Sequence, residues 1–338
     1  MNPRQLVKSN QTALDRFCKA LKTRKSFLLA SHVNPEGDSA ACLIAMDSLL
    51  RRLGKKSLIV CQDPFPERIG VLSSKRWNRA HDLKPDQKFD ALLAADCPTL
   101  DRIGEVRNFI EPGMSIFNID HHYTNDRFGD YNYIQTQAGA CGEVVYEVFN
   151  HMGISINKEE ATALYVAITT DTNSFKYSST TSRTHLIVAD LISKGVDVEK
   201  VNENLYATYS LHKMKLYSRL LAKVKTAHRG DVAWVGMSRN DLKVTGARQE
   251  DAEGFIDFLK YIREIKFAFF INENDGAESI RVSLRSKGKF DASKVASAFG
   301  GGGHQKASGC TIRHHTLEKA AQLLLKEIGK QLNGQVNV

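Results

Sequence analysis

The chain has 338 residues, about twice the length of an average domain of roughly 150 residues. Hydrophobic residues make up 42% of it and charged residues 25%, a balance typical of soluble globular proteins that excludes a disordered or fibrous chain. Its longest apolar runs are far shorter than the ~20 residues of a membrane-spanning helix, and no apolar signal core follows the N-terminus. We therefore expect a cytoplasmic protein with no membrane partner.

The net charge of +9 is modest and its distribution is uneven. Residues 281–313 contain a single acidic residue, Asp291, and many more basic ones: Arg281, Arg285, Lys287, Lys289, Lys294, Lys306 and Arg313. Such a segment suits contact with anions. The 6 cysteines are scattered and form no C-x-x-C pair, which argues against a zinc knuckle or a disulfide framework.

The first half of the chain alternates short apolar runs with helical patterns. A helix is predicted over residues 6–21, and strands over residues 26–31, 57–61, 89–95 and 115–119, with a helix over 39–53. Near-continuous apolar strands are typical of a parallel sheet covered on both faces. The pattern then becomes helical over residues 142–152, 158–170, 182–194 and 210–223.

The second half shows apolar runs at residues 232–237, 266–272 and 279–284, a glycine run at 300–303 and a closing helix at 317–332. We interpret it as a smaller α/β domain. The predicted organisation is a parallel-sheet domain with helices on both faces at residues 1–195, a helical connector at 196–225, and the smaller α/β domain at 226–338.

Acidic and histidine side chains follow three of the predicted strands. His32, Glu36 and Asp38 lie in one strand-to-helix loop, Asp96 follows the run 91–95, and residues 120–122 form the triplet Asp-His-His after the run 115–119. In open parallel sheets, ligands bind beyond the carboxyl ends of the strands. Singly, Asp38 could cap a helix and Asp96 could stabilise a turn. Together the residues predict a divalent metal site, and the imidazoles favour Mn²⁺ over Mg²⁺.

The motifs resemble those of the DHH phosphoesterases. The His-x-Asn-Pro-Glu-Gly-Asp loop at 32–38, Asp96, the triplet at 120–122 and the segment Thr-Asp-Thr-Asn-Ser-Phe at 170–175 follow the order of the four family motifs. Residues 299–309, with four glycines before His304, resemble the glycine-rich signature of the DHH-associated C-terminal domain. The length and two-domain layout are similar to the oligoribonucleases called nano-RNases, some of which dephosphorylate 3'-phosphoadenosine 5'-phosphate.

The resemblance implies a role for each matching residue. His32, Glu36 and Asp96 would bind one metal ion; Asp38, Asp96, His121 and Asp171 would bind a second. Two ions can generate a hydroxide nucleophile and stabilise charge on phosphoryl oxygens. His122 would face the scissile phosphate and Asp120 would orient the histidines. Glu36 departs from the family pattern, which most often has Asp there.

The glycine run leaves backbone amides unshielded, so a phosphate could approach the main chain there; a simple hinge is the alternative. Neighbouring basic side chains favour the first interpretation. The expected substrate-binding residues are Arg285, Gly302, Gly303, His304 and Lys306; for Arg285 and His304 the resemblance to the family implies this role.

We therefore expect a metal-dependent phosphodiesterase with two Mn²⁺ ions, Mg²⁺ being the other candidate, that degrades very short single-stranded RNA or dinucleotides to 5'-mononucleotides. Removal of the 3'-phosphate from a nucleotide bisphosphate is a second expected activity. A phosphodiesterase for cyclic or linear dinucleotide signals stays open, as do a nucleotide-binding protein with weakened catalysis and a homodimeric state.

Overall fold

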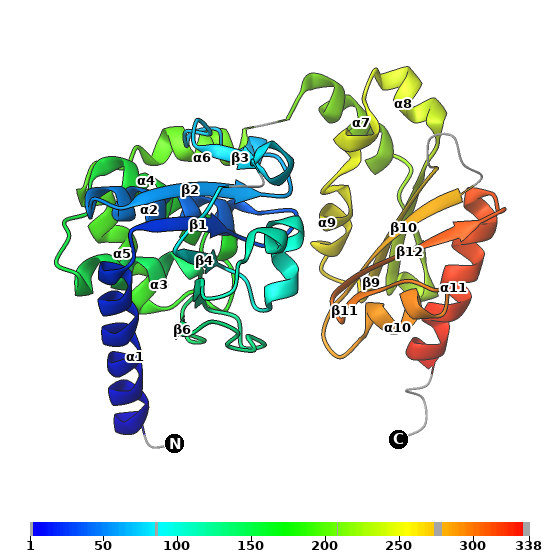
Figure 1. The fold of residues 1–338 in the computed structure, drawn as a ribbon. Helices are drawn as coiled ribbons and strands as arrows, with labels where there is room; N and C mark the ends of the chain where they lie inside the picture. The colour runs from blue at the N-terminus through cyan, green and yellow to red at the C-terminus, as the bar shows by residue number, and fades with distance from the viewer. Residues whose placement is uncertain (1–2, 85–86, 208, 274–278, 334–338) are drawn as a thin grey trace. The chain divides into compact units, whose positions relative to one another are not determined.

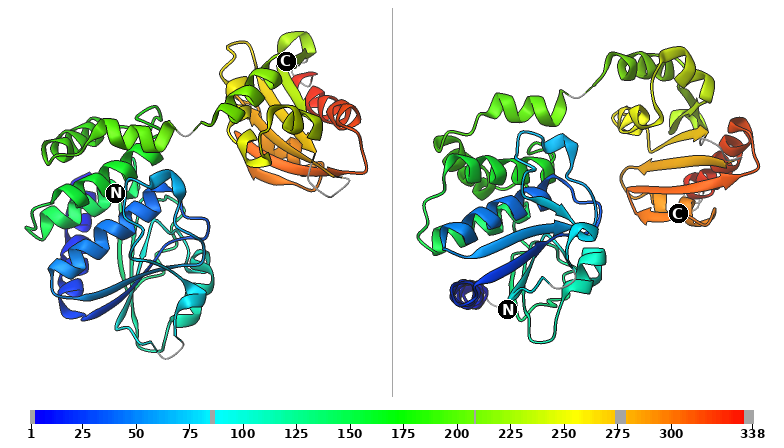
Figure 2. Two further views of the ribbon diagram at one scale, coloured as in Figure 1. Left: turned by 90° about the horizontal axis from the view of Figure 1, so that it is seen from above. Right: turned by 45° about the horizontal axis from the view of Figure 1, so that its top comes forward.

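The computed structural model describes residues 3–84, 87–207, 209–273 and 279–333. The chain divides into two compact units, Met1–Thr208 (unit 1) and Tyr209–Val338 (unit 2). Each contains a six-stranded sheet with helices packed against it (Figures 1 and 2). No helix within the described residues is long and apolar enough to cross a membrane.

The sheet of unit 1 has the order β3-β2-β1-β4-β5-β6, and every neighbouring pair is parallel. Its strands in sheet order are Trp77–Arg79, Lys56–Cys61, Ser26–Ala30, Ala91–Ala95, Ser115–Asp120 and Tyr131–Ile134. The four central strands confirm the predicted parallel sheet. The edge strands β3 and β6 are short and partly polar, so they lack the apolar run from which the others were predicted.

Side chains alternate between the two faces along each strand, and those of the central strands are buried on both faces. Phe27 and Leu29 pack into the core formed with the α-helices, whereas Leu28 packs on the opposite face with Ile103 and Val106 of the 3-10 helix η3, Leu100–Phe109. Helices therefore flank both faces, as expected. The α-helices of unit 1 are α1 Pro3–Thr23, α2 Gly37–Arg52, α3 Cys141–His151, α4 Lys158–Asp171, α5 Ser182–Ser193 and α6 Val198–Tyr206.

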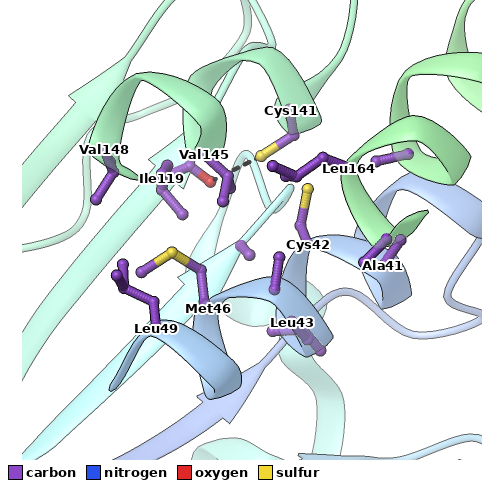
Figure 3. Close-up of a cluster of buried hydrophobic side chains, with 14 of the residues drawn as sticks. Ala41, Cys42, Leu43, Met46, Leu49, Ile119, Cys141, Val145, Val148 and Leu164 are labelled. Atoms are coloured by element: carbon purple, nitrogen blue, oxygen red, sulfur yellow. Dashed lines mark hydrogen bonds between the residues drawn. The ribbon is translucent and has the colours of Figure 1, made fainter. Parts of the chain in front are cut away.

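Helices α2, α3 and α4 meet in a dense apolar layer (Figure 3). Cys42 and Cys141 are buried there among aliphatic side chains, and the Cys141 thiol donates a 3.5 Å hydrogen bond to the Ile119 carbonyl. All six cysteines are buried free thiols. A Cβ at Gly37 would lie 2.5 Å from Thr170 Cγ2, so a side chain on α2 at this position would collide with α4.

The sheet of unit 2 is mixed, with the order β11-β12-β10-β9-β8-β7. Only β8 and β9 pair in parallel; the other neighbours are antiparallel. The strands in sheet order are Gly302–His304, Ala307–Arg313, Ser279–Ser286, Phe267–Glu273, Val232–Met237 and Lys225–Ala227. The helices are α7 Leu211–Leu221, α8 Arg239–Thr245, α9 Phe255–Lys260, α10 Ala292–Ser297 and α11 Leu317–Asn333. Part of the glycine run thus forms an edge strand, β11, which its composition did not indicate.

Unit 2 also holds a buried ion pair. Asp241 has no exposed surface, and its carboxylate accepts hydrogen bonds from Arg219 Nε at 2.6 Å and from the Ser238 amide at 2.9 Å, besides one from Lys223. Burial alone would raise the pKa of Asp241, but these donors hold it below its usual value of 3.8. The carboxylate therefore joins α7 to the start of α8.

We predict that Asp241→Asn lowers the free energy of unfolding of unit 2 by about 1.5–3 kcal/mol at neutral pH, because it removes charge-assisted hydrogen bonds. Since folding lowers this pKa, the contribution is complete above pH 3.8 and is lost as the pH falls through the folded-state value. The difference in urea midpoint between the two proteins should therefore shrink in acid. Glu250→Gln, at an exposed carboxylate of the same unit, is the matched control; an equal effect of both changes would contradict the prediction.

Candidate metal centre and substrate groove

Residues from four separate segments converge at the carboxyl edge of the parallel sheet. Asp38 lies in the first turn of α2, Asp96 directly follows β4, Asp120 ends β5 and Asp171 ends α4. Strands β1, β4 and β5 are neighbours in the sheet, so the loops that follow them open side by side. The topology thus brings together residues that are far apart in sequence.

Two overlapping groups of metal-ligating atoms result. In the first group, one ligand atom of each residue lies within 4.8 Å of the others, and its members are Asp96, Asp120, His121 and His122. The second group obeys the same limit and consists of Asp38, His121 and Asp171. His121 belongs to both groups, so the cluster is continuous.

Asp96 lies between three imidazoles. Its Oδ1 is 3.7 Å from His121 Nε2 and 3.6 Å from His122 Nδ1, and its Oδ2 is 3.8 Å from His32 Nε2. These distances exceed hydrogen-bond lengths, and the buried Oδ1 has no hydrogen-bond partner among the residues that the structure describes. Burial raises the pKa of Asp96. An unpaired buried carboxylate oxygen is costly, so the donor set fits a divalent cation that would satisfy it.

Two of the other three carboxylates of the cluster, Asp38 and Asp171, also have raised pKa values. The pKa of Asp38 is raised well above its usual value, mainly by burial and further by the charges of Asp96 and Asp171. Burial and the neighbouring carboxylates raise the pKa of Asp171 to about 6. Mutual repulsion between buried carboxylates is relieved by a positive charge placed among them, which again favours a cation.

The Asp38 carboxylate has a structural role as well. It accepts hydrogen bonds from the Cys141 amide at 2.7 Å and the Gly142 amide at 3.1 Å, both in the first turn of α3, and one from the Cys42 thiol. These donors hold the carboxylate in place. Capping of its own helix was the alternative role for Asp38; in the structure Asp38 lies inside the first turn of α2, and nothing in the sequence indicates its contact with α3.

Each histidine is held through its Nδ1 atom. His32 Nδ1 is 2.8 Å from the Val33 carbonyl, and His121 Nδ1 is 3.2 Å from the Ala138 carbonyl. A carbonyl only accepts hydrogen bonds, so both Nδ1 atoms carry the proton. In the neutral imidazole this arrangement leaves the lone pair on Nε2, the atom with which His32 and His121 would bind a metal.

Asp120 differs from Asp96 because both of its oxygens are hydrogen-bonded. Oδ1 accepts from His122 Nδ1 at 2.7 Å and from the His121 amide at 2.7 Å, and Oδ2 accepts from Asn125 Nδ2 at 2.6 Å. Burial would raise the pKa of Asp120, but the bond from His122 and the other donors hold it below the usual value. In return Asp120 raises the pKa of His122. Asn125 was not identified from the sequence, where it is one polar residue in a polar loop.

Glu36 lies outside both groups of ligand atoms. It is an exposed residue at the N-cap of α2, where its amide donates a 3.0 Å hydrogen bond to Ser39 Oγ. Its charge contributes to the raised pKa of Asp171, which places it near the cluster. Its assignment as a metal ligand stays a prediction.

A hollow of about 810 Å³ on unit 2 is lined by residues of β10, β11 and β12 and of the glycine run. Arg285, Gly302 and Gly303 line it, together with Arg281 and Arg313. Arg285 is partly engaged, because its Nε donates a 3.1 Å hydrogen bond to Asp257. A Cβ at Gly301 would lie 2.2 Å from the Gly309 carbonyl, so the glycine run also packs tightly on β12.

The other two expected substrate residues lie outside the set that lines this hollow. His304 is exposed at the end of β11. Lys306 is directed to the backbone, where its Nζ donates to the Phe290 carbonyl at 2.8 Å and to the Gly288 carbonyl. Their roles in substrate binding stay predictions.

Comparisons with known proteins match both units. The model of the DHH family, N-terminal domain, matches residues 26–168, and the model of the DHHA1 domain matches residues 242–334. The chain is similar to the bifunctional oligoribonuclease and PAP phosphatase NrnA of Thermus thermophilus, with 27% identity over 90% of this chain and 89% of the relative. It is also similar to the protein of the same name from Bacillus subtilis, with 27% identity over 85% of this chain and 89% of the relative.

A solved structure shows the same fold. The exopolyphosphatase-related protein of Bacteroides fragilis has a TM-score of 0.84 and 26% identity, covering 95% of this chain and 96% of that one. The two family models together span most of the chain and occur in the order that the motifs predicted. The chain therefore belongs to the DHH family of phosphoesterases, with a DHHA1 domain in its C-terminal unit, and is a hydrolytic enzyme.

Proposed function

We propose that this enzyme is a Mn²⁺-dependent phosphodiesterase that degrades very short RNA to 5'-mononucleotides and also removes the 3'-phosphate of 3'-phosphoadenosine 5'-phosphate. The observation that carries the proposal is the buried, unpartnered Oδ1 of Asp96 among carboxylates and imidazoles. The names of the relatives from Thermus thermophilus and Bacillus subtilis support the substrate class.

In this proposal His32, Glu36 and Asp96 hold one ion, and Asp38, Asp96, His121 and Asp171 hold the other. Mixed carboxylate and imidazole ligands favour Mn²⁺ over Mg²⁺. When bound, a pair of such ions lowers the pKa of water and neutralises charge on the phosphoryl oxygens. Asp38 and the histidines are positioned by backbone groups, so little reorganisation is needed on binding.

His122 is the proton-carrying group of the site. Its Nδ1 donates to Asp120 and its pKa is raised by that bond, so the imidazolium form extends to higher pH. The side chain is 36% exposed, whereas that of Asp120 is fully buried. His122 can therefore present Nε2–H to a phosphoryl oxygen while Asp120 fixes the ring.

We propose that residues 1–195 provide the metal ligands and that residues 226–338 bind the substrate. The hollow on unit 2 combines glycine backbone with three arginines, a chemistry that suits phosphate groups. Its limited volume favours a short substrate over a long polymer.

The proposal is tested by incubating the enzyme with Mn²⁺ and each of several substrates: RNAs of two to five nucleotides, cyclic dinucleotides and 3'-phosphoadenosine 5'-phosphate. We expect release of 5'-mononucleotides from the shortest RNAs and of phosphate from the bisphosphate. Turnover of cyclic dinucleotides alone would support a signal phosphodiesterase instead, and tight binding without turnover would support a nucleotide-binding protein.

Asp96→Asn should reduce turnover by at least about 100-fold, the upper end of the losses caused by outer-shell changes at metal sites. Asn is the suitable replacement because residue 96 has φ +53°, a left-handed conformation that Asn tolerates. Steady-state kinetics with a dinucleotide measure the effect, and an unchanged circular dichroism melting curve controls for folding. A parent-like rate would refute the metal assignment.

Glu36 gives a separate test of the first metal position. Glu36→Asp should lower the Mn²⁺ concentration for half-maximal activity, because a shorter arm restores the usual ligand of the family, and Glu36→Ala should raise it. Metal titrations of the three proteins measure this order. Parent-like curves for Glu36→Ala would remove Glu36 from the ligand set.

Arg285→Ala should raise KM for dinucleotides by about tenfold or more with little change in kcat, because it removes a charge-assisted bond to the substrate. Asp257→Asn is a matched variant: it weakens the ion pair that occupies Arg285 and should leave KM unchanged or lower. If both variants raised KM equally, Arg285 would act through its ion pair with Asp257 and not through a bond to the substrate.

A further inference from the structure

A second cavity lies within unit 1, away from the metal cluster. Its volume is about 720 Å³, and its walls come from α2, β2, the loop 71–76, α4 and α6. Asp47 on α2 and Thr162 on α4 line it, each nine residues from the metal-cluster residue on the same helix, Asp38 or Asp171. At 1.5 Å per residue the two sites are about 14 Å apart along each helix.

A buried carboxylate holds two arginines at this cavity. Asp47 accepts from Arg76 Nε at 2.5 Å and Nη2 at 3.0 Å, and from Arg51 Nε at 3.1 Å, while Ser57 Oγ donates to it at 2.6 Å. The side chain of Asp47 is only 2% exposed. Within the described residues, Arg76 Nη1 and both Nη atoms of Arg51 have no hydrogen-bond partner. The guanidinium groups are therefore fixed, with donors left over for an anion.

The charge of the lining also favours an anion. Lys75, Lys158 and Lys200 line the cavity and are exposed. Of the acidic side chains in the lining, Glu160 is buried in an ion pair with Arg52, which does not line the cavity. Asp197 accepts a hydrogen bond from the Lys200 amide. Asp47 and Glu160 are each paired with arginine, so the acidic side chains left in the lining are Asp197 and Glu159, and the three lysines outnumber them.

The uncharged part of the lining is mainly apolar. It consists of Ile44, Ile59, Val71, Leu72 and Val201, with the hydroxyl side chains of Ser48, Ser73 and Thr162. A cavity of this volume is within the range of small-molecule sites. A cavity that combines apolar surface with fixed arginines and lysines suits a ligand with a flat apolar group and a phosphate.

We propose that this cavity binds a nucleoside monophosphate, with its base against the apolar surface and its phosphate against Arg51, Arg76 and the lysines. The choice of a nucleotide rests on the proposed function, which releases such molecules as products. The ligand would touch α2 and α4, which carry Asp38 and Asp171 at their other ends. The cavity is therefore a candidate site for feedback by product.

Hydrogen exchange of the full chain, followed by mass spectrometry with no metal added, tests the proposal. AMP should protect the amides of residues 70–76 and of α6, and adenosine or inorganic phosphate should protect them at least about tenfold less effectively. Protection by either fragment equal to that by AMP, or no protection by AMP, would overturn the assignment.

A charge-reversal variant localises the effect. Lys75→Glu with Lys200→Glu leaves the buried Asp47 pairs intact and should raise the AMP concentration for half-maximal protection at least tenfold. Lys19→Glu with Lys88→Glu makes the same charge change at exposed positions of unit 1 outside the lining and should have no effect. Equal effects of the two variants would overturn the proposal. Hydrolysis is measured separately, so loss of AMP protection with intact turnover refutes this site and not the proposed function.

Discussion

The buried carboxylate of Asp96 is the group around which the metal-ligating side chains of unit 1 are arranged. It sits at the end of a fully buried strand, in a left-handed backbone conformation, with one oxygen that no protein donor satisfies. Such a group is destabilising unless a cation completes it. Two further carboxylates with raised pKa values, Asp38 and Asp171, are held close to it by helices α2 and α4. These carboxylates therefore lower the stability of the fold at this edge of the sheet when no cation is bound.

The carboxylates of this site fall into two kinds, distinguished by their hydrogen bonds. Asp120 accepts bonds at both oxygens and keeps a low pKa, so it serves to orient His122 and to stabilise its charge. Asp96 accepts none at Oδ1 and has a raised pKa, so it is available to a cation. Asp38 is intermediate, because amides of α3 fix it while neighbouring charges raise its pKa. The same residue type therefore performs different chemistry according to its partners.

In unit 2 a tightly packed glycine-rich segment also borders the hollow lined by arginines. Gly301 is required because a side chain there would collide with β12. The same close packing leaves the run beside a hollow lined by arginines. In unit 1, Gly37 has a comparable role, since it lets α2 approach Thr170 beside two residues of the metal cluster. At both positions the lack of a side chain allows close packing, next to the hollow in unit 2 and next to the metal cluster in unit 1.

The sequence by itself determined the central parallel strands, the main helices and the residues with metal-binding chemistry, because apolar periodicity and the order of the motifs are local properties. It did not reveal the edge strands β3, β6, β7 and β11 or the inner strand β12, whose polar, small or glycine-rich residues form strands only through pairing with neighbours. Nor did it reveal the contact of Asp38 with α3, the bond from Asn125 to Asp120, or the pairing of Asp47 with two arginines. The contacts of Asp38 with α3 and of Asp47 with Arg76 join segments whose separation in the chain carries no information about their distance in the fold. Only the tertiary structure decided which carboxylates are satisfied and which are left for a cation, because that depends on where each backbone donor lies.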